Sequence, residues 1–93
     1  MSIKFEFLGP LKVLVGGQES VEVEAATIVE ALEKLNDQFG AVNQRLLEES
    51  GSLHRHINIY VNEVDIRQKD QLNTRLSDGD VATVISAIAG GWR

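Results

Sequence analysis

Alternating hydrophobic and polar residues mark two strands near the beginning of the chain. Residues 3–7 and residues 21–24 both alternate with a period of two, the pattern of strands with one face in a core. Gly9-Pro10 ends the first strand. Residues 11–15 form either a widened hairpin loop or the start of the second strand. Because the two strands are close in sequence, we expect them to pair as an antiparallel hairpin.

A helical repeat replaces this alternation after Thr27. Thr27 and Glu30 have the spacing of a capping box, in which the two side chains accept hydrogen bonds from the first free backbone amides. Hydrophobic residues then recur at the helical spacing, at positions Ile28, Ala31, Leu32, Leu35 and Phe39. Gly40 ends the helix because glycine tolerates a positive φ. The pattern predicts one long helix packed on a sheet, followed by a short helical turn at residues 42–47.

The second half of the chain returns to strands. Residues 57–61 alternate, a turn at residues 62–63 follows, and residues 64–66 can pair back. A second turn at residues 77–80 precedes a final strand over residues 81–88. This order predicts an α+β fold, with a mixed sheet of four to five strands and one long helix across it.

The final strand is hydrophobic or β-branched on both faces. Ala82 and Val84 point to one side, and Val81, Thr83 and Ile85 to the other. A single helix covers only one face of the sheet, so the second face is either a surface for a partner or that of a central strand buried on both sides.

Charge and composition exclude several classes of protein. The 93 residues include 14 acidic and 9 basic side chains, and the net charge of −5 argues against binding to nucleic acid. Much of the excess lies between Glu19 and Asp37, as either a solvated face or a surface for a basic partner. No cysteine is present, which excludes disulfides and thiolate chemistry. No signal-peptide pattern or apolar run of membrane-spanning length is present, and we expect a cytoplasmic protein.

No catalytic constellation stands out. On a strand, His54 and His56 would share one face, but the sequence has no third histidine or cysteine to complete a zinc site, and His54 and Arg55 are more typical of polar residues that lead into a strand. Neither Gly-Gly pair belongs to a phosphate-binding loop, and no serine lies on a nucleophile elbow. We therefore expect neither an enzyme nor a metal site.

Three segments together carry a resemblance to a known family. Residues 53–67 are similar to the central strand and turn of the CysO-type sulfur carriers, residues 76–81 to the turn before their last strand, and residues 88–91 to their Gly-Gly terminus. The chain thus resembles the ubiquitin-like sulfur carriers of the ThiS and MoaD families. The resemblance implies a β-grasp domain over residues 1–88 and a flexible tail over residues 89–93.

The resemblance also implies a reaction. A ubiquitin-activating-type adenylyltransferase uses ATP to adenylate the carboxylate of the terminal glycine, here Gly91. Sulfide then displaces AMP and leaves a thiocarboxylate. Gly90 and Ala89 would thread the narrow enzyme cleft, where a glycine lacks an obstructing Cβ. The carrier itself binds no cofactor and acts as a cosubstrate, while its partner enzymes use ATP and sulfide.

Two residues after the Gly-Gly pair depart from the simplest family pattern. Trp92 and Arg93 follow Gly91, so the resemblance implies cleavage between Gly91 and Trp92 by a JAMM-type zinc metalloprotease. A remnant of cloning is the alternative origin of the two residues. The extension is similar to that of carriers that serve a sulfur-accepting synthase, in some cases PLP-dependent, in the formation of homocysteine, methionine or cysteine.

Two further functions are compatible with the same tail. A ubiquitin-like modifier would be joined through Gly91 to lysines of target proteins, and a β-grasp binding module would leave the tail unused. For the carrier, Thr83, Ile85 and Ile88 are the candidate patch that the adenylating enzyme grips.

Overall fold

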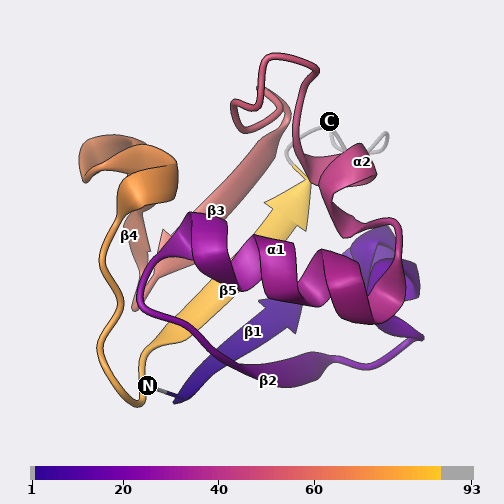
Figure 1. The fold of residues 1–93 in the computed structure, drawn as a ribbon, viewed down its shortest axis with the longest axis horizontal. Coiled ribbons are helices and arrows are strands. Elements are labelled where there is room, and N and C mark those ends of the chain that lie inside the picture. Colours follow the sequence, from indigo (N-terminus) through magenta and orange to yellow (C-terminus); the bar gives the residue numbers. More distant parts are fainter. Residues whose placement is uncertain (1, 87–93) are drawn as a thin grey trace.

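The computed structural model describes residues 2–86 as one mixed sheet with helices on one face (Figure 1). The expected α+β arrangement, with one long helix across the sheet, is confirmed. In chain order the elements are β1 (Ser2–Phe7), the 3-10 helix η1 (Gly9–Val15), β2 (Ser20–Glu24), α1 (Ile28–Phe39), α2 (Val42–Leu46), β3 (Ile57–Val61), β4 (Val64–Asp65), the 3-10 helices η2 (Ile66–Gln68) and η3 (Gln71–Asn73), and β5 (Val81–Ser86).

The sheet places the last described strand in its centre. The strand order is β2-β1-β5-β3-β4. The pairs β1–β2, β3–β4 and β3–β5 are antiparallel, whereas β1 and β5 are parallel. Because β1 pairs with residues 81–84 of β5 and β3 pairs with residues 82–86, most of the β5 backbone is engaged, and its side chains are what it offers to a partner.

The core lies between the sheet and α1. The alternation in β1 buries Ile3, Phe5 and Phe7 completely, and the rings of Phe5 and Phe7 lie 6.2 Å apart. The face of α1 that packs on them is also fully buried, at Ile28, Ala31, Leu32 and Leu35. Each large side chain removed from water in this way contributes about 1.5–3 kcal/mol to folding.

The predicted ends of α1 are confirmed. The Thr27 hydroxyl accepts a hydrogen bond from the backbone amide of Glu30 at 3.2 Å. The Glu30 carboxylate accepts one at 2.8 Å from Ala26, one residue earlier than a standard capping box. Gly40 has a φ of +92° and donates its amide to the carbonyl of Asn36 at 2.7 Å.

Residues 11–15 differ from both expectations. They belong to η1 and not to a strand or an open hairpin loop. Pro10 lies in the first turn of η1, where its fixed φ suits a helix and its missing amide costs nothing. The helix η1 places Leu11 and Val15 in the core, where 1% and 0% of their surfaces are exposed. This burial gives the segment its helical conformation.

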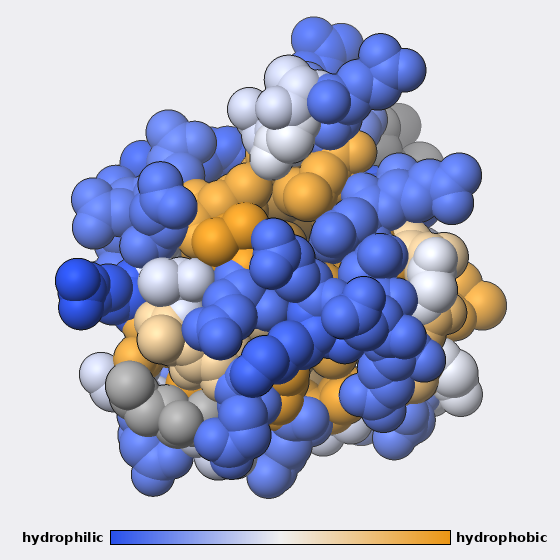
Figure 2. All heavy atoms as spheres, in the orientation of Figure 1, coloured by the Kyte–Doolittle hydropathy of each residue, from blue (hydrophilic) through white to orange (hydrophobic). Residues whose placement is uncertain are grey.

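The acidic residues between Glu19 and Asp37 lie mainly at the surface of β2 and α1. Figure 2 shows hydrophilic side chains over most of the face that α1 covers, with hydrophobic atoms visible between them. Lys34 lies 3.8 Å from Glu30, and Lys12 lies 3.7 Å from Glu19. Both pairs are solvent-exposed and contribute little to stability.

The final strand is described as far as Ser86. Residues 87 and 88 of the predicted strand, and the predicted tail, lie outside the described residues. None of the helices within residues 2–86 has the combined length and apolar character needed to span a membrane.

Candidate functional site

The outer face of β5 is the first feature of the candidate site. Ala82 and Val84 point toward α1 and are completely buried, whereas Thr83 and Ile85 alternate to the opposite face and are partly exposed. The structure therefore places these two predicted docking residues together on one open face. Ile88, the third predicted member, lies outside the described residues.

Neighbouring strands add polar and aromatic side chains to this face. Thr83 pairs with Glu6 of β1 on one side and Tyr60 of β3 on the other. The Thr83 hydroxyl donates a hydrogen bond to the Glu6 carboxylate at 3.4 Å. Ile85 pairs with Asn58 of β3. The open face is thus a half-apolar surface with a carboxylate at its centre, and not the face of a strand buried on both sides.

Sequence reasoning missed the contributions of β1 and β3 to this face. The alternation does indicate that these residues face away from the core, because Glu6, Asn58 and Tyr60 occupy the polar positions of two alternating strands. Their place beside Thr83 and Ile85 depends on the strand order, however, which no local pattern specifies.

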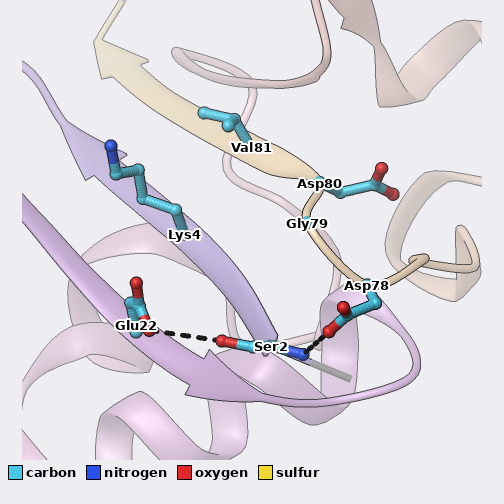
Figure 3. A pocket seen from close by; sticks show the side chains of 7 residues that line it. All are labelled: Ser2, Lys4, Glu22, Asp78, Gly79, Asp80 and Val81. Atoms are coloured by element: carbon cyan, nitrogen blue, oxygen red, sulfur yellow. Dashed lines mark hydrogen bonds between the residues drawn. The ribbon is translucent and has the colours of Figure 1, made fainter.

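The turn before β5 fixes where the strand begins. Figure 3 shows the depression beside this turn, where the backbone amide of Ser2 donates to the Asp78 carboxylate at 2.8 Å. The Asp80 carboxylate accepts hydrogen bonds from the Ser77 amide at 2.8 Å and the Asn62 side chain at 2.9 Å. Gly79 supplies a φ of +88°, which is unfavourable for other residues. These acidic groups therefore hold the turn and the N-terminal strand together.

The end of β5 is held from both sides. Ser86 pairs with Ile57 of β3, and the amide of Leu8, just after β1, donates to the carbonyl of Val84 at 3.0 Å. The segment beyond Ser86 is consequently attached to the middle of the sheet. The predicted reactive and cleavage residues lie outside the described residues: Ala89, Gly90, Gly91, Trp92 and Arg93.

The described residues offer no group of ligands for a metal. No cluster of three or more histidine, cysteine or acidic side chains suited to a metal ion occurs within residues 2–86. The rings of His54 and His56 lie 5.3 Å apart, but a zinc site needs at least three protein ligands.

Comparison with known proteins supplies the context for this geometry. Residues 5–91 match the model of the ThiS family. The sulfur carrier protein CysO of Mycobacterium tuberculosis is 40% identical over 78 residues, which cover 82% of this chain and 84% of CysO. Small archaeal modifier protein 3 of Haloferax volcanii is 29% identical over 94 residues, which cover 98% of this chain and 100% of the modifier.

A solved structure agrees with the fold. A chain in the crystal structure of the BexX/CysO complex from Amycolatopsis orientalis superposes with a TM-score of 0.88 at 35% identity, over 96% of this chain and 99% of that chain. The β-grasp fold expected from the resemblance is thereby confirmed. The family match covers most of the chain and includes the Gly-Gly pair, so the chain belongs to the ThiS family of β-grasp sulfur carriers.

Proposed function

We propose that this sulfur carrier delivers sulfur as a thiocarboxylate on Gly91, after removal of Trp92 and Arg93. The observation that carries the proposal is that the match to the ThiS family ends at Gly91 and leaves out the two residues that follow. Hydrolysis of the peptide bond between Gly91 and Trp92 consumes one water and exposes the Gly91 carboxylate. The proposed enzyme for this step is a JAMM-type zinc metalloprotease.

Activation then takes place on the partner enzyme. A carboxylate oxygen of Gly91 attacks the α-phosphorus of ATP and releases pyrophosphate, which gives an acyl-adenylate. Sulfide attacks the acyl carbon, and AMP leaves. The oxygen of the broken bond departs with AMP, and sulfur takes its place in the thiocarboxylate. The carrier is consumed and regenerated as a cosubstrate, and the ATP and sulfide are bound by the enzymes.

The central position of β5 suits this role. Ser86 is anchored to β3, and the five residues from 87 to 91 span about 17 Å when extended, at ~3.4 Å per residue. A segment of this length reaches into a cleft while the folded domain stays outside. Gly90 and Gly91 lack a Cβ and so pass through a narrow channel.

The open face of β5 is the proposed docking surface for the adenylating enzyme. Thr83 and Ile85 present partly exposed side chains beside Tyr60, and Ile88 is the proposed continuation. The related CysO of Amycolatopsis orientalis was crystallised as a complex with BexX, which supports the inference that this fold binds a protein partner.

The sulfur acceptor is proposed by analogy with the CysO relatives. We infer a PLP-dependent or similar synthase that accepts the sulfur and forms a sulfur amino acid such as homocysteine, methionine or cysteine. Incubation of the thiocarboxylate form with candidate acceptors, followed by detection of the sulfur-containing product and of the regenerated Gly91 carboxylate, tests this assignment.

A second function is favoured by one specific observation, the similarity to small archaeal modifier protein 3. In that case the Gly91 acyl-adenylate would pass to an enzyme thiol and then to a lysine amine. The test is to incubate a chain ending at Gly91 with the adenylating enzyme and ATP, with and without sulfide. Sulfide-dependent release of AMP, with a change in mass that corresponds to exchange of one oxygen for sulfur, supports the carrier. Conjugates to other proteins that survive reduction and denaturation support the modifier.

A further inference from the structure

A group of basic side chains lies at the start of β3, the strand that pairs with the end of β5. The rim cluster comprises His54, Arg55, His56 and Arg67. Ser86 pairs with Ile57, so the three residues just before β3 lie beside the end of β5. The Arg67 guanidinium also lies at the start of β3, because it donates to the Ile57 carbonyl at 2.9 Å and to the His54 carbonyl at 3.2 Å.

Neither arginine of the rim cluster forms an ion pair within residues 2–86. Arg67 donates to two backbone carbonyls and to the Asn58 amide oxygen at 2.6 Å, all of them uncharged. Arg55 donates to the His56 ring at 3.4 Å. Asp65 lies close by, but its carboxylate accepts from the backbone amide of Arg67.

The backbone of His54 and His56 and the Arg67 side chain are held in place by hydrogen bonds. The His54 amide donates to the Leu46 carbonyl of α2 at 2.8 Å, and the His56 amide donates to Nδ1 of His54 at 3.1 Å. Arg55 and Arg67 are nonetheless exposed to solvent. A charged group that is already positioned, as the Arg67 guanidinium is, loses little conformational entropy when it binds. The rim cluster therefore has the properties of a recognition surface on a chain whose net charge is −5.

We propose that the rim cluster binds a carboxylate-bearing surface at the mouth of the enzyme cleft that receives the residues beyond Ser86. This inference rests on the proposed function, because an enzyme acting on Gly91 must bring its cleft within about 17 Å of Ser86, at ~3.4 Å per residue. The mouth of the cleft then faces the rim cluster. Acidic groups there meet two guanidinium groups that form no ion pair within residues 2–86, and such complementarity sets orientation and association rate.

The test uses the chain ending at Gly91 and its adenylating enzyme. Arg55→Glu reverses one charge of the rim cluster and removes only the long contact to His56. Arg75→Glu is the matched control, because Arg75 is also exposed but lies where the chain bridges to Thr27 at the start of α1. Pyrophosphate release is measured against carrier concentration at low salt and at about 0.5 M salt, where charges are screened within a few Å.

We expect Arg55→Glu to raise the KM for the carrier about tenfold at low salt, with kcat unchanged. The difference from wild type should shrink at high salt, and Arg55→Lys and Arg75→Glu should stay within about twofold of wild type. Equal KM values for Arg55→Glu and Arg75→Glu would overturn the inference while leaving the proposed function intact, as would a rise in KM that salt does not reduce. Absence of pyrophosphate release from the wild-type chain would overturn both.

Discussion

The Asp80 carboxylate accepts a hydrogen bond from the side-chain amide of Asn62 at 2.9 Å. This contact joins the turn before β5 to the turn after β3. The Asn62 side chain also accepts a hydrogen bond from the Val81 amide at 3.1 Å. The first residue of the strand that leads to the C-terminal segment is therefore positioned by a pair of polar side chains.

Loss of this contact should destabilise the fold. In Asp80→Ala the Ser77 amide and the Asn62 side chain both lose their acceptor, so we expect a fall of about 1–2 kcal/mol in the free energy of unfolding. Urea denaturation followed by circular dichroism measures it. Asp70→Ala is the matched control, since the Asp70 side chain is exposed, and it should change stability by less than about 0.5 kcal/mol. Equal effects of the two substitutions would show that the Asp80 contacts contribute nothing.

The cap of α1 gives a prediction with an internal control. Thr27→Ala removes the hydroxyl that accepts from Glu30 and should cost about 1 kcal/mol of stability. Thr27→Ser keeps that hydroxyl and should recover most of the loss. Thermal and urea unfolding of the two variants provide the comparison. A serine variant no more stable than the alanine variant would contradict the assigned capping role.

The open face of β5 should affect partner binding more than folding. Ile85→Asp places a charge on the proposed docking patch, and we expect kcat/KM for adenylation to fall at least about tenfold, equivalent to ~1.4 kcal/mol. Val64→Asp changes another exposed hydrophobic residue, 42% exposed on the two-residue edge strand β4, and should have little effect. Circular dichroism and urea unfolding verify that both variants fold. If folded Ile85→Asp is adenylated like wild type, the patch is assigned wrongly.

A side chain added at Gly90 should impair activation of the chain. In a chain ending at Gly91, Gly90→Val adds a branched side chain where the segment enters the cleft, and we expect adenylation to fall about 100-fold or more, since misplacement by about 1 Å costs that much. Ala87→Val makes a similar change nearer the sheet and should have a much smaller effect. Pyrophosphate release by both variants at saturating carrier measures the difference. Equal rates for Gly90→Val and wild type would exclude threading through a narrow channel.

The elements that sequence predicts best are those with a complete local pattern. The alternation in residues 3–7 corresponds to β1, and the repeat from Ile28 to Phe39 together with its caps corresponds to α1. The segment around Pro10 was mispredicted because glycine and proline are compatible with loops as well as with a short 3-10 helix. Its conformation follows from the burial of Leu11 and Val15, which is a tertiary effect.

Of the candidate site, the sequence predicts only the residues that lie on β5 itself. Alternation placed Thr83 and Ile85 on one face, and the structure confirms it. Two other contacts depend on pairing between segments that are distant in the sequence. They are the pairing of Tyr60 with Thr83 and the hydrogen bond from Arg67 to the carbonyl of Ile57. Such contacts follow from the order of strands in the sheet, and alternation within one strand does not specify that order.

Intact-mass spectrometry of the full chain tests the central claim most directly. The protein is incubated with a JAMM-type protease, the adenylating enzyme, ATP and sulfide, with single omissions as controls. We predict loss of Trp92 and Arg93, followed by exchange of one oxygen for sulfur that requires both ATP and sulfide. Retention of Trp92 and Arg93, together with failure of a chain genetically ended at Gly91 to be adenylated, would contradict the account.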